Sequence, residues 1–288
     1  MAVVLITGCS SGFGLDAAIA FAENGDTVVA TMRNLAKADP LRKKAADAGV
    51  EIDLEALDVV SDESVTNAVD AVLARHGRID VVVNNAGVGY GGSIETMPID
   101  SARDLMETNF WGALRTIRAV LPGMRAQRSG VIINVTSLAG RLPGTMYEGM
   151  YSVSKHALGT LSEALQSEVT PFGIRVVCIE PGFFATAIAV NNESVDQGFA
   201  GTAYEADAQW FRNFMETSVS AGADPRIVAD RIVTAAHDPN AVIHQAIGDD
   251  AAAYLSVLES AGGTYEGWIA GAIPIVESVV GPRPPAGD

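Results

Sequence analysis

Short apolar runs alternate with amphipathic stretches along most of the chain. Runs rich in valine, isoleucine and leucine predict β-strands at residues 3–6, 27–32, 52–57, 79–83, 131–135, 174–179 and 241–247. Between them, apolar positions recur with helical spacing at residues 12–24, 38–48, 62–76, 101–127, 149–172 and 225–237. Continuous apolar strands are typical of a parallel sheet covered by helices on both faces. The sequence therefore predicts a single α/β domain over residues 1–288, a Rossmann-type doubly wound parallel sheet of about seven strands.

The pattern changes after residue 181. Residues 187–222 carry several aromatic side chains but no strand pattern, so we expect an insertion there. Residues 276–288 include the sequence Gly-Pro-Arg-Pro-Pro and are predicted to form an extended C-terminal tail.

Composition narrows the classes of function. The 288 residues are 48% hydrophobic and 19% charged, as in a globular protein with a large core. The formal net charge of -16 argues against nucleic acid and anionic membrane as partners, because both would be repelled. An anionic cofactor would need a local basic site.

Cysteine usage and the start of the chain bear on its location. Cys9 and Cys178 fall in a turn and in a predicted strand, so a disulfide framework is not expected. The chain enters a strand without a basic leader, and no apolar run reaches the roughly 18 residues that span a bilayer. We therefore expect a cytoplasmic protein. The four histidines are scattered, which argues against a metal site.

A glycine-rich turn follows the first predicted strand. Gly8, Gly12 and Gly14 lie between a strand and a helix, where glycine lets the backbone approach a pyrophosphate. The helix N-terminus adds unpaired N–H groups and a partial positive charge. The alternative is a tight turn without a ligand. The other residues of this predicted dinucleotide site are Ser10, Ser11 and Phe13.

The end of the second strand indicates which dinucleotide fits. An acidic residue there would bind ribose hydroxyls and repel a 2′-phosphate, but this chain has Arg33. A guanidinium offers several N–H donors in fixed geometry and keeps its charge. NADP(H) is therefore favoured, with NAD(H) as the alternative. Because Lys37 and residues 42–44 also make this region basic, Arg33 is alternatively a solvated surface charge.

Tyr151 and Lys155 are four residues apart in a predicted helix, so their side chains project from the same face. A phenol has a pKa of about 10, and a nearby ammonium lowers that pKa. Such a pair can transfer protons near neutral pH. The same spacing is also common on surface helices.

These motifs together resemble the short-chain dehydrogenase/reductase family over almost the whole chain, most of all its branch of 17β-hydroxysteroid and retinol dehydrogenases. The glycine spacing, the sequence Asn84-Asn85-Ala86-Gly87 and the Tyr151-x-x-x-Lys155 pair are similar to the family's signatures. The cofactor contacts that the resemblance adds to the turn and to Arg33 are Asp58, Val59, Asn85, Ala86, Gly87, Tyr151, Lys155, Pro181, Gly182 and Thr186.

The resemblance implies hydride transfer between a nicotinamide and a carbonyl carbon. Tyr151 would be the acid or base, Lys155 would lower its pKa and hold the nicotinamide ribose, and Ser137 would polarise the substrate oxygen. Asn109 would hold a water that links Lys155 to solvent. Alternatively, Ser137 simply ends a strand, Asn109 pairs with the backbone of a bent helix, and Lys155 is solvated.

Large apolar side chains indicate the substrate class. In the family, the segment that corresponds to residues 187–222 covers the substrate, so its aromatic content favours a bulky lipophilic ketone or alcohol, steroid-, retinoid- or aromatic-like. Trp210, Phe211 and Phe214 also have the spacing of an ordinary buried helix face. The predicted substrate-binding residues are Ser137, Met146, Tyr147, Tyr151, Phe183 and Phe184.

Family members usually associate through two long helices, here residues 101–127 and 149–172, so we expect a homodimer or homotetramer. Leu158, Leu161, Leu165 and Val169 form an apolar stripe that fits either core or interface. Two other functions remain open. A catalytically idle NADP(H)-binding sensor would not need the four predicted catalytic residues together, and sugar-nucleotide epimerases typically space their glycines differently.

Overall fold

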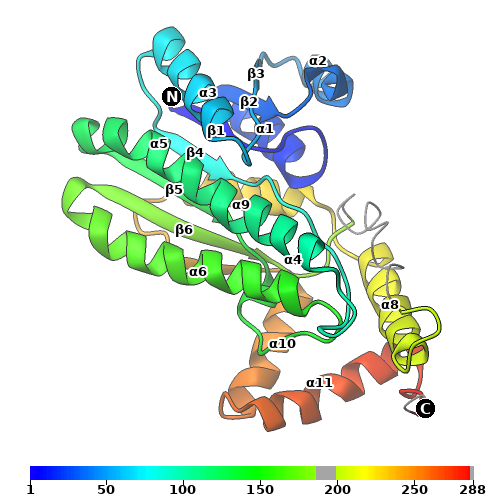
Figure 1. The fold of residues 1–288 in the computed structure, drawn as a ribbon. Coiled ribbons are helices and arrows are strands. Elements are labelled where there is room, and N and C mark those ends of the chain that lie inside the picture. Colours follow the sequence, from blue (N-terminus) through cyan, green and yellow to red (C-terminus); the bar gives the residue numbers. More distant parts are fainter. Residues whose placement is uncertain (186–198, 286–288) are drawn as a thin grey trace.

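The computed structural model describes residues 1–185 and 199–285 and has the predicted α/β architecture (Figure 1). The strands are β1 (Val3–Ile6), β2 (Thr27–Met32), β3 (Asp53–Ala56), β4 (Val81–Asn84), β5 (Gly130–Val135), β6 (Ile174–Pro181) and β7 (His244–Ile247). The described helices are α1 (Gly12–Glu23), α2 (Asp39–Ala48), α3 (Asp62–His76), α4 (Ile99–Met106), α5 (Gly112–Gln127), α6 (Gly149–Val169), α8 (Glu205–Ser220), α9 (Arg226–His237), α10 (Asp249–Ser260) and α11 (Tyr265–Val280).

The described strands form one seven-stranded sheet in the order β3-β2-β1-β4-β5-β6-β7, and every neighbouring pair is parallel. The chain fills the sheet outward in one direction from β1 to β3 and then in the other from β4 to β7. Such a switch between β1 and β4 leaves a crevice beyond the carboxyl ends of the strands, where ligands bind in open α/β sheets. The predicted doubly wound sheet is confirmed.

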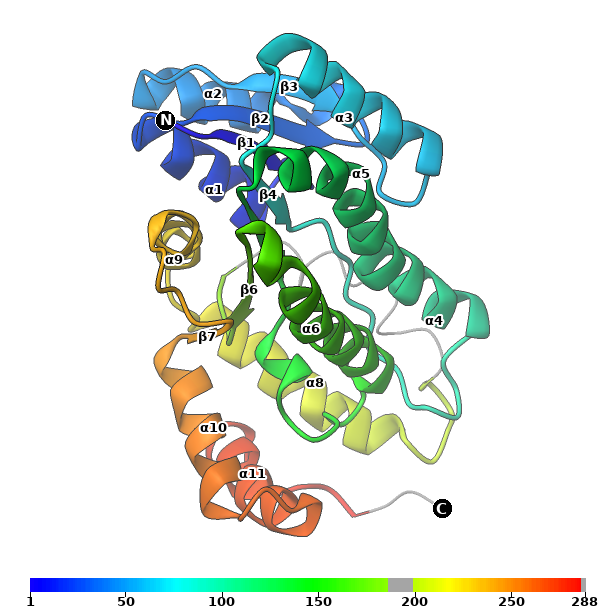
Figure 2. The ribbon, with the colours of Figure 1, turned by 90° about the vertical axis from the view of Figure 1, so that its left-hand side faces the viewer.

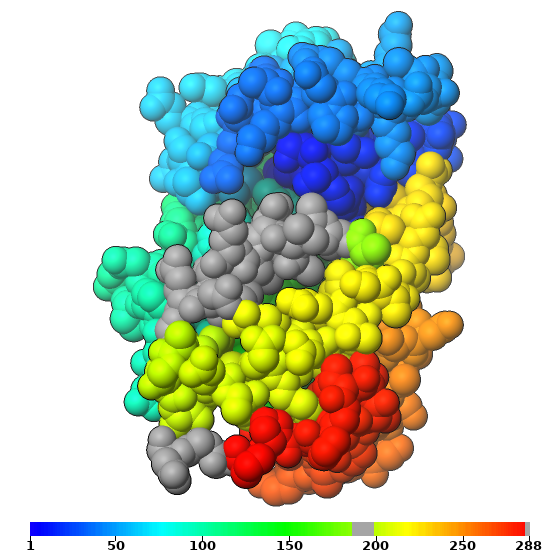
Figure 3. Space-filling view, turned by 90° about the vertical axis from the view of Figure 1, so that its right-hand side faces the viewer, coloured from blue at the N-terminus to red at the C-terminus, as the bar shows by residue number. Residues whose placement is uncertain are grey.

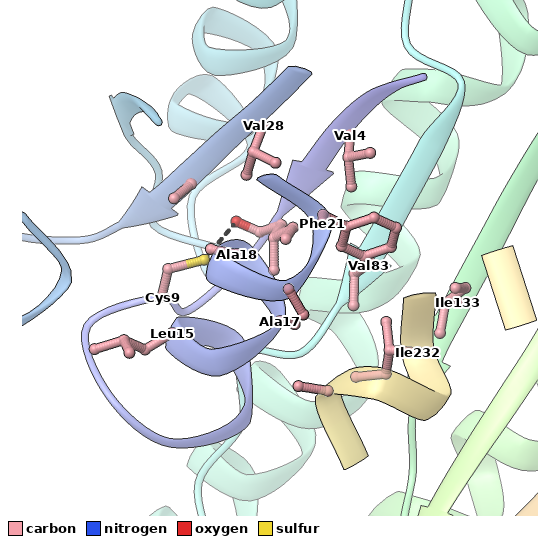
Figure 4. Packing of buried hydrophobic residues seen from close by; sticks show 14 of the residues in the cluster. Val4, Cys9, Leu15, Ala17, Ala18, Phe21, Val28, Val83, Ile133 and Ile232 are labelled. Atoms are coloured by element: carbon pink, nitrogen blue, oxygen red, sulfur yellow. Dashed lines mark hydrogen bonds between the residues drawn. The ribbon is translucent and has the colours of Figure 1, made fainter. Parts of the chain in front are cut away.

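Helices cover both faces of the sheet (Figure 2). On one face α1, α2 and α9 pack on the strands, and Phe21 of α1 is fully buried in one cluster with Val4, Val83 and Ile232 (Figure 4). On the other face α3, α5 and α6 form a second cluster with the alternate strand positions. The apolar stripe predicted for the helix at residues 149–172 lies in α6. Leu158, Leu165 and Val169 are buried and Leu161 packs against the second cluster, so the stripe belongs to the core.

A third apolar layer lies beyond the carboxyl ends of the strands. It joins α8, α10 and α11 through Phe211, Phe214, Tyr254 and Trp268, each no more than 8% exposed. Figure 3 shows α8 in yellow-green and yellow beside the red C-terminal segment on one face of the molecule. None of the described helices is both long and apolar enough to cross a membrane.

Two predicted elements differ from the structure. The helix expected at residues 101–127 is interrupted by a π-helical turn, Glu107–Trp111, between α4 and α5. The prediction of an extended tail from residue 276 is wrong for residues 276–280, because α11 continues to Val280. The buried side chain of Val276 holds this last turn against the third apolar layer. Helices α10 and α11 were not predicted.

Buried amides connect the middle of the sheet to α6. The Asn84 side-chain amide donates to Asn134 Oδ1 (2.8 Å), and the Asn134 amide donates to Ser162 Oγ (2.7 Å). All three residues are buried. Because Asn84 and Asn134 lie near the carboxyl ends of β4 and β5, these bonds fix the origins of the two loops that follow.

We predict that Asn134→Ala lowers the free energy of unfolding by about 1–3 kcal/mol, because the Asn84 amide and the Ser162 hydroxyl lose a partner where water cannot replace it. The measurement is the midpoint of urea denaturation. Asn240→Ala is the control, since Asn240 is exposed and should change stability by less than about 0.5 kcal/mol. Equal midpoints for the two variants would contradict the prediction.

Candidate active site

A cavity of about 840 Å³ lies at the carboxyl ends of the strands and brings most of the predicted site residues together. Ser137, Tyr151 and Lys155 line it, as do Met146, Phe183 and Phe184. Thr186 lies outside the described residues. The predicted cofactor residues that line the cavity are Gly8, Ser10, Ser11, Gly12, Phe13, Arg33, Asp58, Val59, Asn85, Ala86, Gly87, Pro181 and Gly182.

The glycine-rich turn has the properties of an anion site. Gly8 and Gly12 adopt φ angles of 74° and 58°, in the left-handed region that favours glycine. The turn ends at Ser11, the N-cap of α1, whose side chain makes no capping hydrogen bond. The first turn of α1 contains no acidic residue, so its N–H groups and positive end face the cavity without a competing carboxylate. These features fit the diphosphate of a dinucleotide.

Gly14 has a packing role in place of the predicted ligand contact. It is not among the residues that line the cavity, and a Cβ there would lie 2.3 Å from the Asn85 amide nitrogen. That amide donates to the carbonyls of Thr7 (2.9 Å) and Gly8 (3.1 Å). The missing side chain at Gly14 therefore lets the loops after β1 and β4 join.

Arg33 and Lys37 follow β2 and bring two positive charges to one end of the cavity. Both are exposed, and neither forms an ion pair within the described part of the chain. Asp58 lies on the same wall, where its carboxylate accepts a hydrogen bond from Val60 N (3.2 Å). Two unpaired cations beside an anion-binding turn suit a ligand that carries an additional phosphate.

The proton-transfer residues lie on the cavity wall formed by α6 and the end of β5. Lys155 Nζ is 5.7 Å from the centre of the Tyr151 ring and donates to the Val135 carbonyl (2.9 Å). Ser137 follows β5 and caps a short 3-10 turn, with its hydroxyl accepting a hydrogen bond from Ala139 N (3.2 Å). The predicted grouping of Ser137, Tyr151 and Lys155 around one space is therefore present.

Burial dominates the pKa values of this group. It raises the pKa of Tyr151 to about 12, while the Ser137 hydroxyl lowers this pKa and the charge of Glu148 raises it. Burial also lowers the pKa of Lys155 to about 8. We expected Lys155 to lower the phenol pKa, but its ammonium is directed to the Val135 carbonyl and desolvation outweighs its charge. Tyr151 is thus protonated at neutral pH.

Asn109 lies in the π-helical turn, and its backbone partner is Val88 in the loop after β4, not the helix backbone of the alternative interpretation. Its side chain accepts from Val88 N (2.8 Å) and donates to Val88 O (2.9 Å) and Ser154 Oγ (3.0 Å). It does not line the cavity, although a Cβ on Gly87 would be 3.2 Å from Asn109 Oδ1 and 3.6 Å from Lys155 Nζ. Asn109 therefore positions the loop that borders Lys155.

The family described as short chain dehydrogenase matches residues 2–197. The chain belongs to this family. Human retinol dehydrogenase 8 is 40% identical over 183 residues, which cover 62% of this chain and 58% of that protein. Rat estradiol 17-beta-dehydrogenase 1 is 35% identical over 249 residues, which cover 82% of this chain and 71% of that protein. The predicted family and its similarity to retinol and hydroxysteroid dehydrogenases are confirmed.

Solved structures agree with this assignment. A short-chain dehydrogenase from Streptomyces avermitilis has a TM-score of 0.77 at 34% identity, covering 94% of this chain and 97% of that one. A variant of actinorhodin polyketide ketoreductase, solved with NADPH, has a TM-score of 0.72 at 31% identity, covering 85% and 94% of the two chains. The chain is thus an oxidoreductase by family, and its fold is the one that these structures share.

Sequence reasoning anticipated the α8 part of the far cavity wall but missed the part that α10 and α11 form. Phe211 and Phe214 of α8 form the buried helix face that their spacing indicates, and they also line the cavity. The spacing of the apolar positions on α11 was a visible helical signal, but nothing in it indicated a substrate wall. The wall residues that were not predicted are Glu148, Tyr254, Trp268, Ile269, Ala272, Ile273 and Val276.

Tyr147 is a correction to the predicted substrate site, because it does not line the cavity. Its backbone has φ 56°, and its hydroxyl donates to Asp207 Oδ2 (2.6 Å). Asp207 of α8 also accepts two hydrogen bonds from Arg283, at 2.7 and 2.6 Å. Arg283 in turn lies 5.9 Å from the centre of the Trp210 ring. Tyr147 therefore ties the loop before α6 to α8 and to the C-terminal segment.

We predict that Arg283→Ala loosens this connection and lowers the free energy of unfolding by about 1 kcal/mol, since the ion pair is partly exposed. Amide hydrogen exchange should increase near residues 145–149 and at the end of α11. Arg103→Ala, which removes a fully solvated ion pair with Asp100, is the control. Unchanged exchange in both segments of the Arg283 variant would refute the connection.

Proposed function

We propose that the protein is an NADP(H)-dependent alcohol dehydrogenase or carbonyl reductase that interconverts a ketone or aldehyde and an alcohol. The observation that carries the proposal is a shared cavity: Ser137, Tyr151 and Lys155 line the same space as the glycine-rich turn and Arg33. A proton donor, an anion site and an apolar wall are the three parts that this reaction needs.

NADP(H), when bound, supplies or accepts the hydride. Gly12 and the N-terminus of α1 would hold its diphosphate, and Arg33 and Lys37 would bind the 2′-phosphate. In reduction, Tyr151 donates its proton to the carbonyl oxygen, which the Ser137 hydroxyl polarises. The resulting phenolate is stabilised by the Lys155 ammonium, which is largely protonated below its pKa of about 8.

A bulky lipophilic substrate fits the far wall of the cavity. Phe183, Phe211, Phe214, Met215 and Trp268 present apolar surface opposite the cofactor side. Burying such a substrate against this surface contributes roughly 25 cal/mol for each Å² of apolar area removed from water. Steroid-, retinoid- and aromatic-like carbonyl compounds are therefore the first substrates to test.

We predict that Tyr151→Phe leaves NADPH binding intact and lowers kcat for carbonyl reduction by about 10²–10⁴-fold, because the proton donor is lost. NADPH fluorescence measures binding and NADPH absorbance measures turnover. Tyr265→Phe, at an exposed tyrosine, should behave like the wild type. Substantial turnover by the Tyr151 variant would mean that the proton donor is misassigned, and NADPH binding without any wild-type turnover would favour the sensor.

We predict that Arg33→Ala weakens NADPH binding by about 10–100-fold and leaves NADH binding nearly unchanged, because a charge-assisted hydrogen bond to the 2′-phosphate is lost. Paired titrations with the two cofactors measure the effect. Arg42→Ala is the matched control, since Arg42 is an exposed arginine near Arg33 that pairs with Asp39 and does not line the cavity. Tighter binding of NADH than NADPH by the wild type would overturn the assignment.

A further inference from the structure

Glu148 brings a carboxyl group to the substrate side of the cavity. It is the N-cap residue of α6, three positions before Tyr151, and it lines the cavity beside Met146. Its backbone is fixed on both sides: Ser152 N donates to the Glu148 carbonyl (2.8 Å), and Gly92 N donates to the Tyr147 carbonyl (2.6 Å). The position of the carboxyl group near the phenol is therefore set by α6 itself.

This carboxyl group has no hydrogen-bond or ion-pair partner among the residues that the structure describes. Within residues 1–185 and 199–285, none of the hydrogen bonds or ion pairs involves its oxygens. Two cations of the same region are engaged elsewhere: Arg141 pairs with Glu180 (3.0 Å), and Lys155 donates to Val135. Glu148 also makes no side-chain capping bond to α6. Glu148 is half-buried and lines the cavity, so its carboxyl oxygens are open to a hydrogen-bond donor on a ligand.

Glu148 and Tyr151 lie three positions apart at the start of α6 and line the same cavity. The charge of Glu148 raises the pKa of Tyr151, and burial raises the pKa of the Glu148 carboxyl group to about 7. Because the substrate carbonyl must reach the Tyr151 hydroxyl, a partner for Glu148 would lie only a few bonds from that carbonyl. The apolar residues of α8 and α11 are left to contact the remainder of the substrate.

We propose that Glu148 is a specificity residue that accepts a hydrogen bond from a hydroxyl or amino group on the carbon next to the reacting carbonyl. The preferred substrate is then an amphipathic hydroxy- or aminoketone with an apolar body, not a purely apolar ketone. This inference rests on the proposed carbonyl reduction and names the substrate class of that same site.

Three ketones of the same ring system test the proposal: acetophenone, α-hydroxyacetophenone and α-aminoacetophenone, each reduced with NADPH by the full-length protein. The wild type should prefer the two donor-bearing ketones in kcat/KM by about tenfold or more, as expected for a hydrogen bond to a charged group. Glu148→Leu should remove both preferences while retaining activity on acetophenone. Glu148→Gln keeps an acceptor but no charge, so it should retain more of the preference for the hydroxyketone than for the aminoketone.

Glu216→Gln removes an exposed carboxylate from α8 and is the control, with all preferences unchanged. Equal kcat/KM for the three ketones in the wild type, or preferences that survive Glu148→Leu, would overturn the role of Glu148 while leaving carbonyl reduction intact. If Glu148→Leu fails to fold, the nearly isosteric Glu148→Gln provides the test: loss of the preference for the aminoketone supports the proposal, and an unchanged preference contradicts it.

Binding separates this inference from the proposed reaction. In the presence of NADP⁺, α-aminoacetophenone should raise the melting temperature of the wild type more than acetophenone does, and Glu148→Gln should remove the difference. If the difference in melting temperature is present but none of the ketones is reduced, the proposed reaction is rejected and the donor site is kept. Absence of the difference in the wild type would reject the donor site.

Discussion

The join between the loops after β1 and β4 is the constraint on which the site depends. The Asn85 amide donates to the Thr7 and Gly8 carbonyls, and the Thr7 hydroxyl accepts hydrogen bonds from the backbone N–H groups of Asn85 and Ala86, both at 3.0 Å. This contact lies just beyond the carboxyl ends of β1 and β4, the paired strands at the switch point of the sheet. It turns the N-terminus of α1 toward the cavity and leaves no space for a side chain at Gly14. A single amide therefore sets the cofactor turn and one border of the catalytic side.

Desolvation gives the catalytic side its chemistry. In water, the pKa values of a phenol and an ammonium four residues apart would differ little from those of free tyrosine and lysine, because solvent screens both groups. Here burial disfavours every charged form, so the phenol stays protonated and the ammonium is held near its point of deprotonation. A charge that develops on the phenol oxygen meets the Ser137 hydroxyl, whose hydrogen bond lowers the pKa of Tyr151 and is already in position.

Most of this arrangement could be predicted from the sequence. The features that could not be predicted depend on tertiary contacts between distant parts of the chain. Strand runs, the glycine turn and the spacing of Tyr151 and Lys155 are local signals, and each parallel strand delivers its following loop to the same edge. The π-helical turn depends on Asn109 pairing with Val88, which is 21 residues away in the chain. Tyr147 is directed away from the cavity because its hydroxyl donates a hydrogen bond to Asp207. The spacing of residues in a helix does not predict such a contact. The cavity wall on α11 lies beyond residues 2–197, which match the family, and the resemblance gave no guide to it.

Net charge is a poor guide to this site because the cavity carries its own charge distribution. The chain has a formal charge of -16, yet one end of the cavity presents Arg33 and Lys37, which form no ion pair with the residues described in the structure. At physiological salt, exposed charges more than about 10 Å away are largely screened, so these two cations control the local potential. At the other end Glu148 presents a carboxyl group among apolar residues. In the proposed reaction, a cavity that is basic near the glycine-rich turn and acidic at Glu148 would favour one orientation of cofactor and substrate, with the substrate carbonyl at Tyr151.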